Sequence, residues 1–313
     1  MTEERRTTGL GSRMNCMILA FLLFCARSHA QIYKVDPAGG HPERLKQLPI
    51  QAESIRTLSY KPDGKRIAIG AFVENHGRIY LVNSDGTGFQ QVGVLDMYAP
   101  TFTPDGKKLL VTGGLRTPTL YLIGLDGSGQ SAIKSDAQMG SFSPDGTKIV
   151  FMRRAVPSEE EELFICNADG SSERQITHMY SATTGPAFNP INGPKGPAFD
   201  PRNSAHVLYS NSRLGSSSFD ISLVDISNLN VHTILNLAGA MPVSDRVALS
   251  PDGKMIAFSR TASETPVKFD IMMSNVDGTG LRNLTSSLPS VNAGVPAFSP
   301  DGKALIFVGI PAD

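Results

Sequence analysis

The sequence predicts an all-β protein, a closed six-bladed β-propeller whose blades are four-stranded and antiparallel. Three observations support this fold class. A short turn sequence recurs along the chain, an apolar run follows each copy, and the two ends of the chain carry complementary parts of one repeat. Self-similarity at about 40 to 50 residues is typical of a repeat architecture. The copies of the turn are Ser-Pro-Asp-Gly or close variants at 61–64, 103–106, 143–146, 250–253 and 299–302.

The turn at 143–146 shows why this sequence joins two antiparallel strands. Ser143 suits the first position of a type I turn, and Pro144 fixes φ for the second. Asp145 can accept hydrogen bonds from nearby backbone, and Gly146 takes the closing position. The recurrent aspartates are therefore predicted to be structural: Asp63, Asp105, Asp145, Asp252 and Asp301.

The repeat that contains this turn predicts four consecutive strands. Residues 140–142 lead into the turn and 148–152 form the second strand. A polar loop precedes a third strand at 162–166, and a second turn, Asn-Ala-Asp-Gly at 167–170, precedes a fourth at 174–177. Four strands in a meander make one propeller blade.

The fourth copy of the repeat is degenerate, and the ends of the chain supply the sixth blade. Phe-Asp-Pro-Arg-Asn at 199–203 stands where the turn is expected, so the count is six. After the last turn the chain has one further strand, 304–308, while 32–36 and 44–47 supply the two strands that this unit lacks. Pairing the two ends would close the ring and remove its open sheet edges.

The repeat resembles that of the TolB-type six-bladed propeller. The shared features are, in order, Phe-Ser-Pro-Asp-Gly-Lys, an apolar strand, Ile-Tyr, Asp-Gly and Leu-Thr. The resemblance covers 31–313 and is best at 247–285 and 294–308. It implies a propeller without the α/β domain that precedes the propeller in TolB, and protein partners in the periplasm.

Residues 1–30 have the pattern of a secretory signal peptide. Arg5, Arg6 and Arg13 form a positive leader, 17–24 is an apolar run too short to span a membrane, and 28–30 offers small residues for cleavage. We therefore expect the mature chain, 31–313, to be periplasmic or secreted with no membrane span. Cys166 would then be its single cysteine, and its place in an apolar strand predicts a buried, unreactive thiol.

Composition and motifs give little sign of chemistry. The 29 basic residues balance 29 acidic ones, so no charge excess indicates nucleic acid as a partner. The chain has no nucleophile elbow, no zinc-protease motif and no phosphate loop, and its Asp-Gly turns lack the glutamate of a calcium loop. Its mature histidines (His41, His76, His178, His206 and His232) show no ligand-like spacing. We predict no catalytic residue, no metal and no cofactor, and favour a protein that is not an enzyme.

Blade geometry places any binding site on one face. The first and third connections of a blade lie on the face of short Asp-Gly turns, whereas the second connection and the crossing between blades carry the irregular sequence. The longest insertion is 179–195, and Glu159 to Glu162 is interpreted as a solvated loop. Predicted partner-binding residues in these segments are Glu74, His76, Arg116, Arg154, His178, Tyr180, Arg213 and Arg260.

Three functions fit this pattern. The first is an exported, monomeric binding protein that holds a protein or peptide partner of the cell envelope on the loop-bearing face. The second is an oligosaccharide-acting enzyme of the lyase type with its site at the channel mouth, because related oligogalacturonate lyases use a propeller with a metal and histidines there. The third is a structural module of an envelope assembly. Convergence of histidine, glutamine and arginine on one point would favour the lyase.

Overall fold

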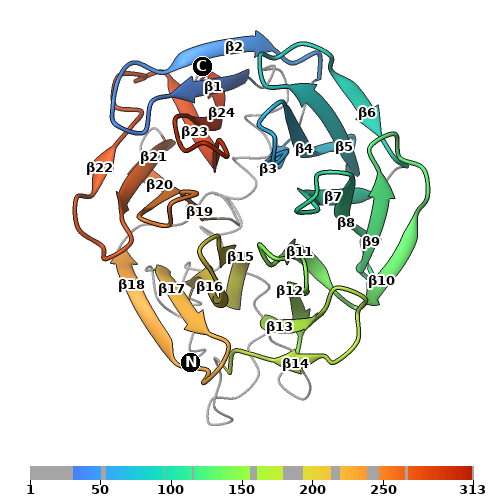
Figure 1. Cartoon of the computed structure of the whole chain (residues 1–313). Coiled ribbons are helices and arrows are strands. Elements are labelled where there is room, and N and C mark those ends of the chain that lie inside the picture. The colour runs from blue at the N-terminus through green and yellow to red at the C-terminus, as the bar shows by residue number, and fades with distance from the viewer. Residues whose placement is uncertain are drawn as a thin grey trace, which may run out of the picture.

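The computed structural model is an all-β ring of six four-stranded sheets around a central axis (Figure 1). It describes residues 31–50, 54–94, 96–114, 116–155, 161–178, 193–212, 219–237, 247–264 and 267–311, and no helix occurs in these ranges. No helix that could span a membrane is found among them. The predicted six-bladed propeller is confirmed. The predicted signal peptide lies outside the described residues.

The strands form four concentric layers. The inner strands are β3 (Ser54–Tyr60), β7 (Met97–Phe102), β11 (Gln138–Phe142), β15 (Gly193–Asp200), β19 (Ala248–Leu249) and β23 (Val291–Phe298). The second strands are β4 (Arg66–Val73), β8 (Lys108–Gly113), β12 (Lys148–Arg154), β16 (Asn203–Ser212), β20 (Met255–Glu264) and β24 (Leu305–Pro311). The third strands are β5 (His76–Asn83), β9 (Thr119–Gly124), β13 (Glu161–Asn167), β17 (Phe219–Asp225), β21 (Val267–Asn275) and β1 (Gln31–Val35). The outer strands are β6 (Gln90–Val92), β10 (Ser131–Ser135), β14 (Arg174–Gln175), β18 (Val231–Leu237), β22 (Arg282–Asn283) and β2 (Glu43–Gln47).

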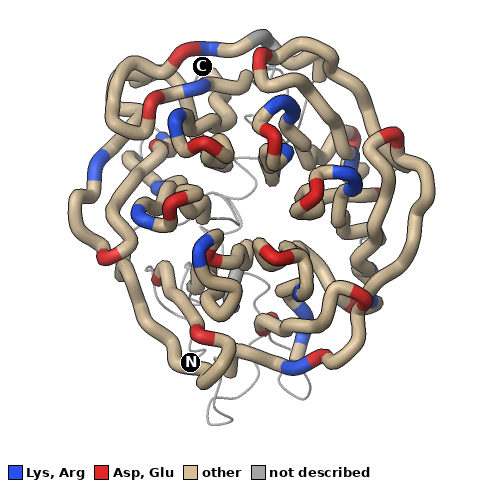
Figure 2. The backbone as a smooth tube through the Cα atoms, in the orientation of Figure 1, with Lys and Arg blue, Asp and Glu red and all other residues tan. Residues whose placement is uncertain are grey.

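Blades 1 to 5 are simple meanders from the inner to the outer strand, starting with β3–β6 as blade 1 and ending with β19–β22 as blade 5. Blade 6 has the order β23-β24-β1-β2, so it joins both ends of the chain. We call the side with the first and third connections of each blade the turn face, and the opposite side the loop face. Figures 1 and 2 view the ring from the turn face, where acidic and basic residues alternate on the innermost turns.

Six hydrophobic clusters hold the ring together, one at each junction between neighbouring blades. The second strands contribute to clusters on both sides: in β12, Val150 belongs to the cluster shared with blade 4, and Ile149 and Phe151 belong to the one shared with blade 2. A strand buried on both faces needs an unbroken apolar run rather than alternation. This requirement explains the apolar run after each turn.

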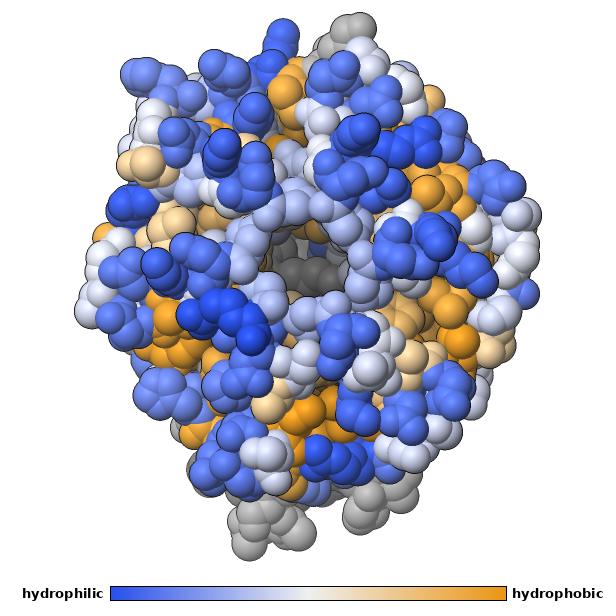
Figure 3. Space-filling view, in the orientation of Figure 1, coloured by the Kyte–Doolittle hydropathy of each residue, from blue (hydrophilic) through white to orange (hydrophobic). Residues whose placement is uncertain are grey.

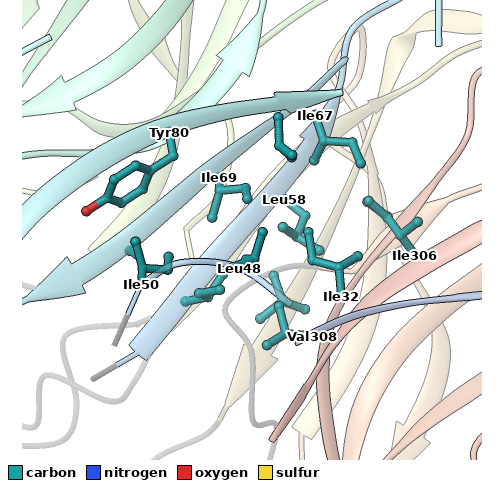
Figure 4. Close-up of a cluster of buried hydrophobic side chains, with 14 residues drawn as sticks. Ile32, Leu48, Ile50, Leu58, Ile67, Ile69, Tyr80, Ile306 and Val308 are labelled. Carbon is teal, nitrogen blue, oxygen red and sulfur yellow. The ribbon is translucent and has the colours of Figure 1, made fainter. Parts of the chain in front are cut away.

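Strand pairing between the two ends of the chain closes the ring. β1 and β24 are antiparallel over five residue pairs, from Gln31 opposite Gly309 to Val35 opposite Leu305. Tyr33 and Phe307 stack with ring centroids 5.4 Å apart. In the junction with blade 1, Ile32 and Val308 meet Leu58 and the residues of β4 (Figure 4). The predicted closure is confirmed.

The innermost turns contact one another around the axis. In blade 3, the Ser143 hydroxyl donates to Asp145 (2.6 Å), and the Thr147 N–H donates to the same carboxylate (3.0 Å). The glycine of each of four turns lies against the preceding turn, so that an added Cβ would come within 4 Å of its proline. These contacts are Gly64 on Pro300, Gly106 on Pro62, Gly146 on Pro104 and Gly302 on Pro251. The turns thus frame the axial opening that Figure 3 shows on this face.

Blade 4 keeps this turn with different chemistry. Asp200 replaces the usual serine, is buried, and binds the Arg202 guanidinium with two hydrogen bonds of 3.2 and 3.0 Å. Arg202 also lies directly over Gly253 of blade 5, where a Cβ would overlap it. An arginine in place of the usual aspartate therefore links blades 4 and 5.

The outer turns interlock in the same way at the rim. Gly170 of blade 3 and Gly278 of blade 5 rest on the carbonyl oxygens of Ile133 and Ile234 in the outer strands of the preceding blades. At the junction of blades 2 and 3, Glu173 also forms an ion pair with Lys134 at 2.7 Å. These contacts require glycine because both turns have positive φ, +86° and +83°.

Deleting residues 31–49 should abolish cooperative unfolding. The deletion removes β1 and β2, exposes the edge of β24 and opens the cluster between blades 6 and 1. Thermal and denaturant unfolding monitored by circular dichroism should show a broad transition in place of a sharp one. A deletion variant that unfolds as sharply as the intact protein would show that the ring does not depend on this closure.

Gly170→Ala should destabilise the protein far more than Gly129→Ala. Both glycines have positive φ, +86° and +63°, but only Gly170 faces a backbone oxygen, while no atom lies within 4 Å of a Cβ added at Gly129. We expect a loss of about 1–2 kcal/mol at Gly129 from backbone strain and at least about 3 kcal/mol at Gly170 from strain plus overlap. Urea unfolding measures both. Equal losses would contradict the interlock.

Candidate functional site

Polar side chains gather on the loop face where blade 1 passes into blade 2. The two-residue connection at Glu74 and Asn75 has positive φ at both residues, 54° and 64°, as a tight hairpin requires. His76 begins β5 and its Nδ1 lies 3.0 Å from Oδ1 of Asp96 in the crossing to blade 2. The Asp96 N–H in turn donates to the Gly77 carbonyl (2.8 Å).

Two further residues join this group, which we call the Asp96 corner: Glu74, His76, Val94, Asp96 and Arg116. Among the residues that the structure describes, Val94 is the most exposed of the large apolar side chains, at 61 %. The Gly114 N–H donates to the Asp96 carbonyl (3.1 Å), and the exposed Arg116 follows two residues later in the same connection. This group thus combines an exposed valine with side chains of both signs of charge, a composition typical of an interface with a polar rim.

A second group, the Tyr98 line, runs from blade 1 across blade 2 to blade 3. It consists of Phe72, Tyr98, Gln138 and Glu161, which lie at strand ends on blades 1 to 3. The Tyr98 hydroxyl donates to Gln138 Oε1 (3.3 Å), and Gln138 Nε2 donates to Glu161 Oε1 (2.7 Å). Phe72 and Tyr98 have ring centroids 5.8 Å apart. Burial, reinforced by the charge of Glu161, raises the pKa of Tyr98 to about 12, so this phenol remains a hydrogen-bond donor at neutral pH.

The inner strands hold this line in place with β-bulges. Pairing is interrupted directly after Tyr98 in β7 and after Gln138 in β11. The residues that follow, Ala99 and Met139, have positive φ of 52° and 55°. Tertiary contacts support the strained backbone: the Met139 N–H donates to Thr112 Oγ1 of the preceding blade (3.0 Å). Such bulges aim side chains at strand ends near functional sites.

The predicted partner-binding residues are spread over several blades, and three of them come together. Glu74, His76 and Arg116 lie in the Asp96 corner. Arg154 is exposed at the end of β12, opposite Glu161 in register, so it lies in a strand rather than a loop. Arg260 is likewise within β20, opposite Asp270.

The other predicted positions do not extend the corner. His178 is exposed on the far side of blade 3, directly after the buried Thr177. Tyr180 and Arg213 lie outside the described residues. The candidate site therefore centres on blades 1 to 3.

The interpretation of Glu159 to Glu162 as a solvated loop is wrong for its second half. Glu161 and Glu162 begin β13, and Glu162 is buried. Its carboxylate accepts a hydrogen bond from Thr177 Oγ1 (2.5 Å), and this hydroxyl also accepts from the Leu163 N–H. Asp270 and Thr285 repeat the arrangement in blade 5. These acids fasten the end of a blade to its third strand, so their role is structural.

Arg153 also serves the fold. Its guanidinium lies 5.3 Å from the rings of Phe151 and Phe164 and binds Glu173 and two carbonyl oxygens of blade 2. These contacts hold the second strand of blade 3 against the outer strand of blade 2.

Metal-binding and nucleophilic groups do not converge within the described part of the chain. It contains no group of three histidine, cysteine or acidic side chains that could hold a metal ion. Cys166 is buried, as predicted, and burial raises the pKa of its thiol to about 11. A thiol in that state is a poor nucleophile at neutral pH.

Sequence reasoning missed Val94, Asp96, Tyr98 and Gln138. The first two lie in the short crossing after β6, and the others lie in inner strands that read as core. One signal was present, because Tyr98 and Gln138 occupy equivalent positions in two repeats. In each repeat the regular pairing with the second strand resumes three residues later, at Thr101 and Ser141, after a bulge. Without the bulges, nothing in the sequence distinguishes them from ordinary strand residues.

No protein-family model matches the chain, but solved structures share its fold. A structure of TolB from Agrobacterium tumefaciens is 16 % identical with a TM-score of 0.71, covering 91 % of this chain and 99 % of that one. TolB from Acinetobacter baumannii is 16 % identical with a TM-score of 0.60, and the match covers 91 % of this chain and 64 % of that longer chain. An oligogalacturonate lyase in complex with manganese is 13 % identical with a TM-score of 0.50, covering 92 % and 99 %. The resemblance to the TolB propeller is thus confirmed for the fold.

The turn aspartates should make the protein sensitive to acid. Hydrogen bonds from Ser143 and Thr147 lower the pKa of Asp145 from 3.8 to about 2, and similar bonds lower the pKa of the other turn aspartates. The folded state therefore binds fewer protons than the unfolded state. Stability from Asp145 is fully present above about pH 4 and disappears as pH falls toward 2.

Asp145→Ala should cost on the order of 1 kcal/mol at neutral pH, through lost turn hydrogen bonds, and the difference from the wild type should shrink as pH falls. Unfolding midpoints between pH 7 and 2 measure both effects. Partner binding should not change. A selective loss of binding at unchanged stability would instead give this aspartate a functional role.

Proposed function

We propose that this chain is an exported, non-catalytic propeller that binds a protein or peptide partner of the cell envelope on its loop face. The structural similarity to TolB and the signal-peptide pattern of residues 1–30 support an envelope role. The binding surface in this proposal consists of the Asp96 corner and the Tyr98 line, with Arg154 at its edge. His178, Arg260, Tyr180 and Arg213 remain further candidates of the same face.

The contrast between the two faces carries the proposal. On the turn face, each aspartate is engaged by its own turn, and the glycines and prolines of neighbouring turns contact one another. Similar turns offer a partner few distinguishing features. On the loop face, Val94 is 61 % exposed and the Glu74 side chain is 81 % exposed, beside an aromatic pair and a hydrogen-bonded line of polar groups. Aromatic and arginine side chains are typical of interface centres.

The lyase alternative has support only from the fold. Its discriminating feature is a convergence of histidine, glutamine and arginine on one point, whereas the histidine of the candidate site, His76, lies against Asp96. The fold of the oligogalacturonate lyase is shared at 13 % identity, which says nothing of activity. We therefore propose binding, and not this reaction, as the function.

Val94→Asp and Arg154→Glu should each weaken partner capture without moving the unfolding midpoint. Both side chains are exposed, so neither change disturbs the packing between blades. Charge in place of an interface valine should reduce affinity by about tenfold or more. The measurement is quantitative capture from envelope extract by the tagged protein, followed by titration of the recovered partner. Arg213→Glu should be measured in the same way, because Arg213 is also a partner-binding residue predicted from the sequence.

Lys107→Glu is the matched control, because this lysine is exposed on the turn face, where no partner contact is proposed. Capture should be unchanged in this variant. A partner whose hydrogen-exchange footprint maps to the turn face, or whose binding falls only in Lys107→Glu, would overturn the assignment of the loop face.

A further inference from the structure

The outer strand of blade 4 differs from the other five. β18 has seven residues, whereas β6, β14 and β22 have two or three. The remaining two, β2 and β10, have five residues each and carry charged side chains such as Arg44 and Lys134. β18, with the sequence Val-His-Thr-Ile-Leu-Asn-Leu, carries no Asp, Glu, Lys, Arg or Pro. Short length and charge are the usual protection of an exposed sheet edge, and β18 has neither.

Apolar side chains are exposed along the same rim. Four large hydrophobic residues of the described chain are exposed, and three of them lie at the rim of blades 4 and 5: Leu229 at 37 %, Val231 at 50 % and Leu281 at 42 %. Leu229 precedes β18, Val231 is its first residue, and Leu281 precedes β22. A concentration of exposed apolar groups at one place marks an interaction surface more than single scattered ones do.

The repeat provides an internal comparison for this rim. Gly170 and Gly278 rest on the carbonyl oxygens of Ile133 and Ile234, so the junctions of blades 2–3 and 4–5 are equivalent. At the first junction, Lys134 directly follows Ile133, Glu173 is three residues after Gly170, and the two side chains form an ion pair. At the second, Leu235 and Leu281 occupy the corresponding positions. The same architecture thus has a charged rim at one junction and an apolar rim at the other.

The backbone of β18 has hydrogen-bonding groups directed outward. The Asp225 N–H donates to the Asn230 carbonyl, and antiparallel pairs alternate, so His232 bonds to β17 while the N–H and C=O of Val231 and Thr233 point away from it. A register shift at Ile234 lies beyond this stretch. β18 ends its sheet, and no described strand pairs with its outer side.

We propose that β18 is a self-association edge, which pairs antiparallel with β18 of a second copy of this chain. A two-fold axis at His232 would place Val231 of each copy opposite Thr233 of the other and satisfy their outward groups. No acidic, lysine or arginine side chains of the two copies would then face each other across the axis, since β18 carries none. The resulting dimer replaces the monomer expected from the sequence and leaves both faces of the ring accessible.

Val231→Lys should dissociate this dimer, because the lysine of each copy would lie on the paired edge, diagonal to the lysine of the other copy. Sedimentation equilibrium of the purified protein should show a dimer for the wild type, and the variant should associate at least about tenfold more weakly. Gln130→Lys is the matched control: Gln130 is exposed at the equivalent position ahead of β10, and its change should leave the dimer intact. Thr233→Pro removes an outward N–H without adding charge and should also weaken the dimer.

Thermal unfolding of all three variants at low concentration shows whether each remains folded. If either Val231→Lys or Thr233→Pro fails to fold, the other still tests the proposal. A wild type that is monomeric up to near-millimolar concentration would overturn the proposal. A dimer that Val231→Lys and Gln130→Lys affect equally would also overturn it. A monomeric wild type whose edge binds an extended segment of another protein would assign β18 to that partner instead and reject self-association.

Discussion

No blade of this protein has a hydrophobic core of its own, and the rest of the structure depends on this constraint. Each of the six buried clusters is shared by two neighbouring blades, so each sheet is stable only between two others. An open row of such sheets would leave an apolar face uncovered at each end. Pairing β1 with β24 removes both ends at once, which makes the N-terminal strand as important to the fold as any central one.

The same constraint separates the two faces. Turns that hold neighbouring sheets in register must contact one another, and their serines, aspartates, glycines and prolines are engaged in doing so. In blades 1 and 2, side chains of the loop-face connections such as Val94 and Glu74 are exposed and are not used to hold neighbouring sheets in register. The irregular connections are therefore concentrated on one side of the ring, which is the side on which we propose that a partner binds.

Blade 4 departs from the repeat in two places, near the axis and at the rim. Near the axis, Arg202 and Asp200 replace the usual turn chemistry and still link the blade to its neighbour. At the rim, leucines stand where blades 2 and 3 have an ion pair, and the outer strand is long and uncharged. The first departure keeps the structural role of the repeat. The second leaves apolar surface exposed, which a structural role does not require.

The sequence by itself determined the number of blades, the turn chemistry, the closure by both termini and the burial of Cys166. These features depend on local turn preferences and on apolar runs of fixed spacing, which are visible in one dimension. It also predicted that Glu74, His76 and Arg116 lie in the connections opposite the Asp-Gly turns. Tertiary structure alone decided that these three meet at Asp96, that Tyr98 and Gln138 form a line across blades, and that Glu162 is buried. Each of those outcomes depends on how one blade is placed against the next and on bulges that rotate a strand end, and neither leaves a distinct pattern in the sequence.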